Sequence, residues 1–174
     1  MIDRMLGAAR LSADTYEEVE RDRSATGQAL LIVVLVTLAS FVGQMLAGEE
    51  VDVVRGLVLG VIRGVVSWAL WALFTWLIGA TILRAEDTEA DWGQLARGTG
   101  FAQTPGLLNV ITFIPAIGLL IALLTFVWTI AGMVVAVRQC LDYTSTLRAF
   151  FVILLAFIPV LILNAIVFTL TGGS

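Results

Sequence analysis

The sequence predicts an all-α, polytopic integral membrane protein, and two observations lead to that prediction. Of the 174 residues, 59% are hydrophobic and the mean hydropathy is +0.98, values outside the usual range of soluble domains. Long uncharged stretches occupy residues 28–47, 65–83, 100–137 and 149–171. A helix of about 20 residues rises ~30 Å, the thickness of the hydrocarbon core of a bilayer. We therefore expect one membrane domain over residues 25–174, preceded by a cytosolic tail at residues 1–24.

The stretch at residues 100–137 is too long for a single crossing, because its 38 residues would form ~57 Å of helix. Pro115 lacks an amide N–H and disfavours helical geometry in the residue before it, so a tight hairpin is expected there. Five transmembrane helices follow from this division. We place the spans at about residues 28–47, 57–83, 96–113, 116–138 and 147–171.

The distribution of arginine predicts the orientation, since the chain has ten arginines and no lysine. With five spans, eight arginines share the side of the N-terminus, and only Arg55 and Arg63 lie on the other side. The positive-inside rule then places the N-terminus in the cytoplasm and the uncharged C-terminus, residues 171–174, outside the cell membrane. Four spans would break this alternation of charge.

The N-terminal tail carries an apolar stripe that is typical of an amphipathic helix. Asp14 and Glu17 have the spacing of a capping pair, so two short helices meeting near Ser12 are also compatible with the sequence. The stripe either packs beneath the bundle and at the lipid headgroups or forms a docking surface for a cytosolic partner. Its members include Ile2, Met5, Leu6, Ala9, Ala13 and Tyr16.

Small residues recur every four positions on the first two spans, a pattern that lets membrane helices approach closely. Gly56, Gly60 and Gly64 form one such face, and Ala39, Gly43 and Ala47 form the other. We expect the two helices to pack through these faces. The alternative is a seam between two copies of the chain.

Three polar residues form a candidate intramembrane site. Arg63 lies inside the second apolar stretch, where it either extends to the headgroups or contributes to a substrate or ion site. Gln103 and Asn109 lie in the third span around Pro105. They either satisfy the backbone groups that the proline leaves free or line a binding site at a broken helix.

Several function classes are disfavoured by what the sequence lacks. It has no histidine, no phosphate-binding glycine loop and no carboxylate within the predicted spans, so we expect neither an enzyme nor a cofactor. The basic residues are scattered singly, which argues against nucleic-acid binding. An acidic run at residues 86–91 lacks a calcium-loop spacing, so no metal site is expected. Asp91 and Gln94 are interpreted instead as the cap of the third helix.

Four segments resemble the prokaryotic branch of the Ypt-interacting protein (Yip) domain family. They are DRSATGQALL at 22–31, WALWALFTWLIGATIL at 68–83, GFAQTPGL at 100–107, and VAVRQCLD at 135–142 with TST at 144–146. The resemblance implies five membrane-spanning helices and a cytosolic N-terminus. Eukaryotic members act in vesicle traffic and associate with Rab GTPases. The chain lacks their D-L-Y-G-P motif, so the resemblance does not extend GTPase binding to any residue here.

The sequence therefore favours a non-enzymatic, multi-pass membrane protein that organises the membrane or binds a partner. The expected partners are the lipid bilayer and other membrane proteins, including further copies of the chain. The alternative is a transport protein for a small molecule, an ion or a lipid, with a polar site inside the bundle.

Overall fold

The computed structural model describes residues 1–48, 52–86 and 88–170, and all regular secondary structure within these ranges is helical. The C-terminal residues 171–174 and Asp87 of the acidic run lie outside the described ranges. Two short helices, α1 (Ile2–Ala9) and α2 (Ala13–Arg21), precede the bundle. Four long helices follow, and two short helical segments lie between the second and the third of them. The long helices are α3 (Ala25–Leu46), α4 (Val53–Leu77, continued by the π-helical turn Ile78–Ile82), α6 (Gly118–Cys140) and α7 (Thr146–Leu170).

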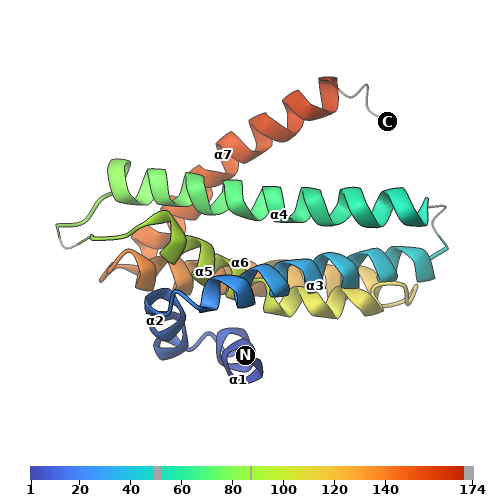
Figure 1. The fold of residues 1–174 in the computed structure, drawn as a ribbon, viewed down its shortest axis with the longest axis horizontal. Helices are drawn as coiled ribbons and strands as arrows, with labels where there is room; N and C mark the ends of the chain where they lie inside the picture. Colours follow the sequence, from blue (N-terminus) through green and yellow to red (C-terminus); the bar gives the residue numbers. More distant parts are fainter. Residues whose placement is uncertain (49–51, 87, 171–174) are drawn as a thin grey trace.

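Helices α3, α4 and α6 run lengthwise through the molecule, and α7 crosses them and diverges from α4 (Figure 1). We call the end that carries the α6–α7 connection, residues 141–145, the tail end. The opposite end, with the turn at residues 112–117, is called the hairpin end. The turn contains Pro115 and connects to α6, as the sequence predicts. Helices α1 and α2 pack on the tail half, beside α5 and α6.

The third predicted span, residues 96–113, is not one continuous helix. It consists of helix α5 (Trp92–Ala102, 11 residues) and a 3-10 segment, η2 (Thr104–Ile111, 8 residues). Pro105 explains the break, because its ring excludes the α-helical hydrogen bond to residue 101 and restricts the residue before it. Four described helices are long and apolar enough to cross a membrane. They are Ala25–Leu46, Val53–Ile82, Gly118–Cys140 and Thr146–Leu163.

Hydrogen bonds at the helix starts explain where two elements begin. Asp91 and Gln94 form the predicted capping box of α5, with N–O distances of 2.8 and 2.7 Å. In the tail, the cap is Ser12 and not the predicted Asp14, since the Ser12 hydroxyl accepts the Thr15 amide at 3.3 Å. The tail therefore contains two helices that meet near Ser12, one of the two arrangements that the sequence allows.

The packed core lies in the tail half of the bundle. Short helix α5 is surrounded there by α2, α3, α4 and α6, and its residues from Leu95 to Ala102 are all buried. Toward the hairpin end, the long helices expose large apolar side chains such as Val54, Leu119 and Leu120. Others, such as Ile82 and Leu147, lie in the tail half. Such side chains suit hydrocarbon, so we interpret the outer faces of the long helices as surrounded by lipid acyl chains.

Candidate functional site

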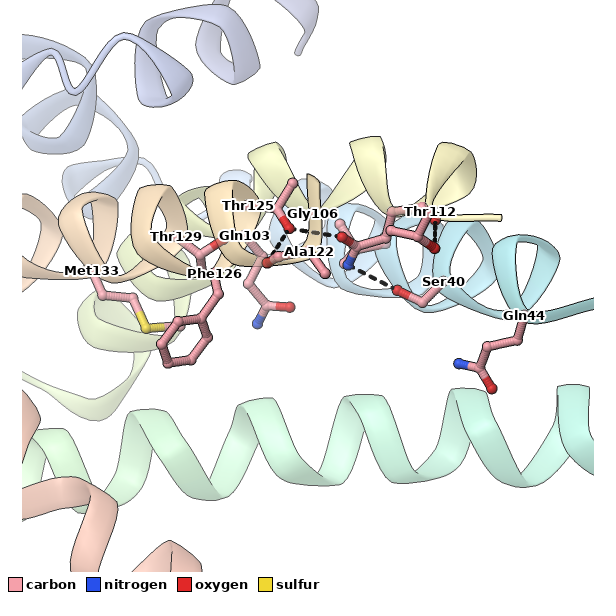
Figure 2. Close-up of a pocket in the computed structure, with 12 residues that line it drawn as sticks. Ser40, Gln44, Gln103, Gly106, Thr112, Ala122, Thr125, Phe126, Thr129 and Met133 are labelled. Atoms are coloured by element: carbon pink, nitrogen blue, oxygen red, sulfur yellow. Dashed lines mark hydrogen bonds between the residues drawn. The ribbon is translucent and has the colours of Figure 1, made fainter. Parts of the chain in front are cut away.

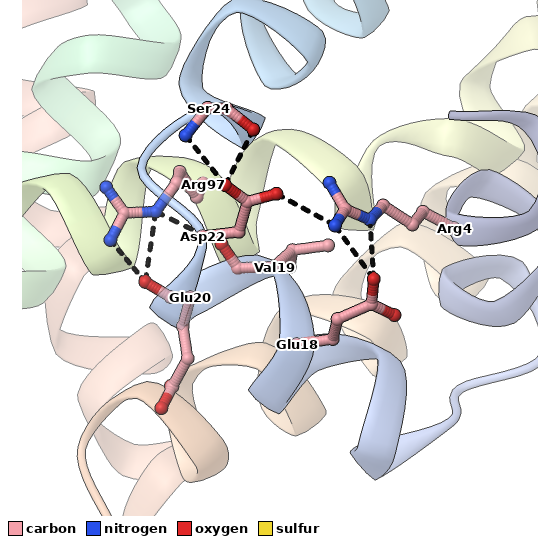
Figure 3. A network of polar contacts seen from close by, with 7 residues as sticks. All are labelled: Arg4, Glu18, Val19, Glu20, Asp22, Ser24 and Arg97. Atoms are coloured by element: carbon pink, nitrogen blue, oxygen red, sulfur yellow. Dashed lines mark hydrogen bonds and ion pairs between the residues drawn. The ribbon is translucent and has the colours of Figure 1, made fainter.

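Arg97 joins the tail helices to the membrane bundle. It lies in the middle of α5 and is only 5% exposed. Its Nε donates to the main-chain carbonyl oxygens of Val19 and Glu20 at 3.1 and 3.0 Å, and one terminal nitrogen also donates to the Glu20 carbonyl. These carbonyls belong to the last turn of α2, where helix C-termini leave oxygen atoms without intrahelical partners. Arg97 therefore caps α2 from the bundle (Figure 3).

Two aromatic side chains complete the attachment of the tail. Tyr16 is fully buried, and its hydroxyl donates to the Ala8 carbonyl at 3.2 Å. The indole N–H of Trp128 in α6 donates to the Ala9 carbonyl at 2.7 Å. A Cβ at Gly132 would lie 2.9 Å from the Tyr16 hydroxyl, so α6 needs a glycine where this ring packs.

The predicted apolar stripe of the tail is divided between two environments. Tyr16 faces the bundle and Met5 is partly buried against the core. Ile2 and Leu6 are 71% and 50% exposed. The stripe is therefore not one continuous docking surface, because its C-terminal part is already used within the protein. The exposed part is what remains for lipid or a partner.

A buried carboxyl group lies in the same junction. Glu20 is 5% exposed, its Oε2 atom has no hydrogen-bond partner, and its side chain extends away from Arg97 (Figure 3). Burial raises the pKa of Glu20, and the neighbouring Cys140 thiol opposes that rise. Arg97 thus binds the main chain of this residue and leaves the Oε2 atom of its carboxyl group without a hydrogen bond.

Charged groups on the outer side of the tail pair with one another. Arg4 contacts Glu18 and Asp22, both at 2.8 Å. The hydrogen bond from Ser24 and then the pairing with Arg4 lower the pKa of Asp22. These contacts tie α1 to the end of α2 (Figure 3).

A second feature is a cleft of about 530 Å³ between α3, η2 and α6 in the hairpin half. Figure 2 shows the side chains of Gln44, Gln103 and Phe126 extending toward the side on which α4 runs. None of the described residues that line it carries a formal charge. The polar lining residues are Ser40, Gln44, Gln103, Asn109, Thr112, Thr125 and Thr129.

Asn109 joins the three walls of the cleft. Its amide nitrogen donates to the Ser40 hydroxyl of α3 at 3.2 Å, and its amide oxygen accepts the Thr125 hydroxyl of α6 at 2.8 Å. The Thr112 hydroxyl donates to its main-chain carbonyl at 2.8 Å. Hydrogen-bonding groups on both ends of the Asn109 amide are therefore satisfied within the protein.

The structure brings together two of the three residues of the predicted polar site. Gln103 and Asn109 line the cleft, whereas Arg63 is exposed on α4 and is not among the described lining residues. Arg63 is therefore not part of this cleft, and a binding role for Gln103 and Asn109 stays a prediction. Within the described part of the chain, the side-chain amides of Gln44 and Gln103 have no hydrogen-bond partner.

The glycines of the two predicted packing faces do not meet each other. On α4, Gly56 lies against the Phe41 ring and Gly64 against Thr37, with Gly60 in looser contact. Gly43 lies instead on the η2 side of α3, where a Cβ would be 2.3 Å from the Asn109 carbonyl oxygen. Helix α3 therefore packs on α4 with larger side chains, and its glycine admits the backbone of η2.

The roles of Arg97 and Glu20 are not among the sequence-based predictions. Arg97 is one of the eight arginines on the predicted cytoplasmic side, and it follows the predicted cap at Asp91 by more than one helical turn. That position inside an apolar helix was a usable signal, because a buried arginine needs acceptors. No comparable local signal marks Glu20, since α2 is otherwise rich in exposed acidic residues.

A known protein family matches nearly the whole helical bundle. The model of the Yip1 domain matches residues 10–167 of this chain, which includes α2 through most of α7. The chain belongs to the Yip1 domain family. Both features described above, the junction around Arg97 and the cleft around Asn109, lie within the matched Yip1 region. No curated protein and no solved structure matches the chain.

Proposed function

We propose that this Yip1-family protein is a non-enzymatic membrane module that organises the bilayer or binds a membrane-associated partner through its N-terminal helices. The single observation that supports this proposal is that α1 and α2 are hydrogen-bonded to the bundle while Ile2 and Leu6 stay exposed. An apolar surface held in one orientation relative to the spans suits repeated contact with the same partner. An unattached tail would sample many orientations.

The proposal includes five crossings, with the N-terminus in the cytoplasm. Helix α5 and segment η2 together would extend ~32 Å, from ~1.5 Å per α-helical residue and ~2 Å per 3-10 residue. That length matches the hydrocarbon core. The arginine distribution supports the same topology, because it places eight arginines on the side of the tail.

Cysteine labelling in intact cells tests this topology. The native Cys140 is buried, so the unmodified protein is a low background for a membrane-impermeant maleimide. We expect A116C at the hairpin end to react from outside the cell. E86C and T144C at the tail end should react only after permeabilisation. Reaction of E86C and A116C from the same side would show that α5 and η2 do not cross together.

The functional test changes only the exposed part of the tail. Ile2→Asp with Leu6→Asp should reduce binding to vesicles or to a membrane partner, since an amphipathic helix binds through its buried apolar area. The matched control is Thr26→Asp with Thr144→Asp, which adds the same charge at exposed positions outside the apolar stripe of the tail. Vesicle morphology and native co-purification are measured after equal membrane insertion is confirmed. Unchanged behaviour of the Ile2/Leu6 variant would reject the tail as the functional surface.

The cleft supports the second candidate, a protein that binds a small molecule or lipid within the membrane. Its lining residues come from α3, η2, α6 and their connections, and none comes from the described residues of α5. Packed residues of α5 occupy the tail half beyond Gln103. This arrangement favours a binding site that ends within the bundle over a passage through it.

A further inference from the structure

We infer that the cleft between α3, η2 and α6 binds an uncharged amphiphilic lipid of the bilayer, with the chemistry of a diacylglycerol. The ligand's hydroxyl or ester group would bond to Gln103, and its acyl chain would lie along Phe126 and Met133. This inference does not depend on the tail surface proposed above.

The inner end of the cleft lies near the middle of the membrane-spanning part of α3. A Cβ at Gly106 would lie 2.7 Å from Val36, which is close to the centre of α3 (Ala25–Leu46). Gln103 precedes Gly106 by three residues and lines the same cleft. Its amide is therefore far from the headgroup region at either end of α3.

An unpartnered amide at that depth is unfavourable in hydrocarbon, where each unsatisfied polar group costs several kcal/mol. Gln103 has no side-chain partner among the described residues, whereas the Asn109 amide donates to Ser40 and accepts from Thr125. Asn109 therefore serves the protein's own packing. Gln103 offers both a donor and an acceptor to a ligand.

The remaining polar groups mark a route from the membrane surface to Gln103. Gln44 lies in the last turn of α3, at the hairpin end, and Ser40 and Thr125 lie between it and the inner end. A polar group that enters along the cleft meets hydroxyl or amide groups over its whole length. The bilayer surface on that side is thus the entrance.

The chemistry of the lining selects an uncharged ligand. None of the described lining residues is acidic or basic, so an ionised group at the level of Gln103 would be buried without a counter-charge. The apolar lining residues Val36, Phe126 and Met133 suit an acyl chain. A volume of about 530 Å³ is within the range of sites for small organic ligands.

Photolabelling tests the inference on the full-length protein in phosphatidylcholine vesicles. The probe is a diacylglycerol with a diazirine on one acyl chain, and the comparison probe is phosphatidic acid with the same chains. We expect saturable labelling of the α3, η2 and α6 segments by diacylglycerol, competed by unlabelled diacylglycerol. Phosphatidic acid should label the exposed helices without saturation.

Two variants and one control locate the site. Gln103→Leu should reduce the saturable labelling about fivefold, the effect expected for one lost hydrogen bond. Ala122→Phe should also reduce it, since Ala122 lines the cleft and the larger ring would fill it. Ser67→Leu replaces an exposed polar residue of α4, which contributes no residue to the described lining, and should change nothing.

Several outcomes would overturn the inference. Saturable labelling that both variants retain would remove the cleft as the site, and equal saturable labelling by phosphatidic acid would remove the selectivity for an uncharged ligand. Absence of any competed labelling would show that no such site exists. The Ile2/Leu6 variant should keep wild-type labelling, so failure of the tail proposal and failure of this one are distinguishable.

Discussion

The guanidinium of Arg97 in α5 binds the main-chain carbonyl of Glu20 in α2, while the carboxyl group of Glu20 extends away from it. An arginine and a glutamate that are so close would ordinarily be expected to pair through their charges. Here the arginine caps the end of a helix instead. The negative, C-terminal end of the α2 dipole stabilises the positive charge of Arg97. The tail is thereby attached to the membrane bundle.

Replacing Arg97 by Leu should release the tail helices from the bundle. Hydrogen bonds from a charged donor contribute ~1.5–3 kcal/mol, so we expect a loss of about 2 kcal/mol in the stability of this junction. Hydrogen exchange of the α2 amides should accelerate in lipid nanodiscs, while exchange in α6 stays slow. Arg84→Leu, at an exposed position, is the control. Unchanged protection of α2 in the Arg97 variant would contradict the capping role.

The stability of the junction should fall as the pH rises, because the pKa of Glu20 is raised in the folded protein. A raised carboxyl pKa favours the protonated form in the folded state. Its contribution is complete below the ordinary carboxyl pKa and is lost as the pH rises through the elevated value. Glu20→Gln should remove this dependence, so the variant gains most over the wild type at the higher pH. Thermal unfolding in detergent between pH 4 and pH 8 measures the difference.

Other titratable groups near Glu20 also affect how the stability of the junction depends on pH. Those that influence the Glu20 carboxyl are Glu17, Arg21, Cys140 and Asp142. Asp22 acts with the opposite sign, since its pKa is lowered and its contribution is lost as the pH falls. An Asp22→Asn variant separates the two effects at low pH. A Glu20→Gln variant with the wild-type slope at higher pH would show that another group titrates.

Alanine at Gly43 and at Gly60 should have different effects, although both glycines belong to predicted small-residue faces. The new Cβ at position 43 would meet the Asn109 carbonyl oxygen at 2.3 Å, which is main chain and cannot rotate away. We expect a loss of ~1–3 kcal/mol from overpacking. At Gly60 the nearest atom is a Thr37 methyl at 3.9 Å, so alanine should be neutral or stabilising by up to ~1 kcal/mol. Denaturation in mixed micelles compares them, and equal effects would contradict the packing.

Asn109→Leu and Gln103→Leu should also differ in stability. Asn109→Leu removes two hydrogen bonds between membrane helices, each worth ~0.6 kcal/mol on average, so it should cost about 1 kcal/mol. Gln103→Leu removes no described hydrogen bond and should leave the melting temperature unchanged or higher. Thermal unfolding in one detergent measures both variants. A Gln103 variant as unstable as the Asn109 variant would show that Gln103 is structural.

Local patterns were sufficient to predict where the chain turns and caps. Pro115 marks the hairpin because a proline restricts the backbone wherever it occurs, and Asp91 with Gln94 marks the start of α5 through a four-residue motif. The residue that separates α5 from η2, Pro105, is also visible in the sequence. That proline indicates that the helix can break there, but the surrounding residues are uniformly apolar, and hydropathy does not distinguish one helix from two.

Polar residues and glycines could not be assigned to partners from the sequence. Gln103 and Arg63 are both polar residues in apolar stretches, yet one lines a cleft and the other is exposed on α4. Helical spacing places residues on a common face of one helix but does not say which neighbour covers that face. Gly43 is the clearest example, since its partner is the backbone of η2.

The sequence by itself determined that this is a helical membrane protein of the Yip1 family with an amphipathic N-terminal tail, because hydropathy, capping and turn formation depend on residues close together in the chain. The tertiary structure decided which part of that tail is exposed, that Arg97 caps α2, and that Asn109 and Gln103 differ in hydrogen bonding. Each of these depends on contacts between residues tens of positions apart. Such contacts follow from how the helices pack together, and no local pattern encodes them.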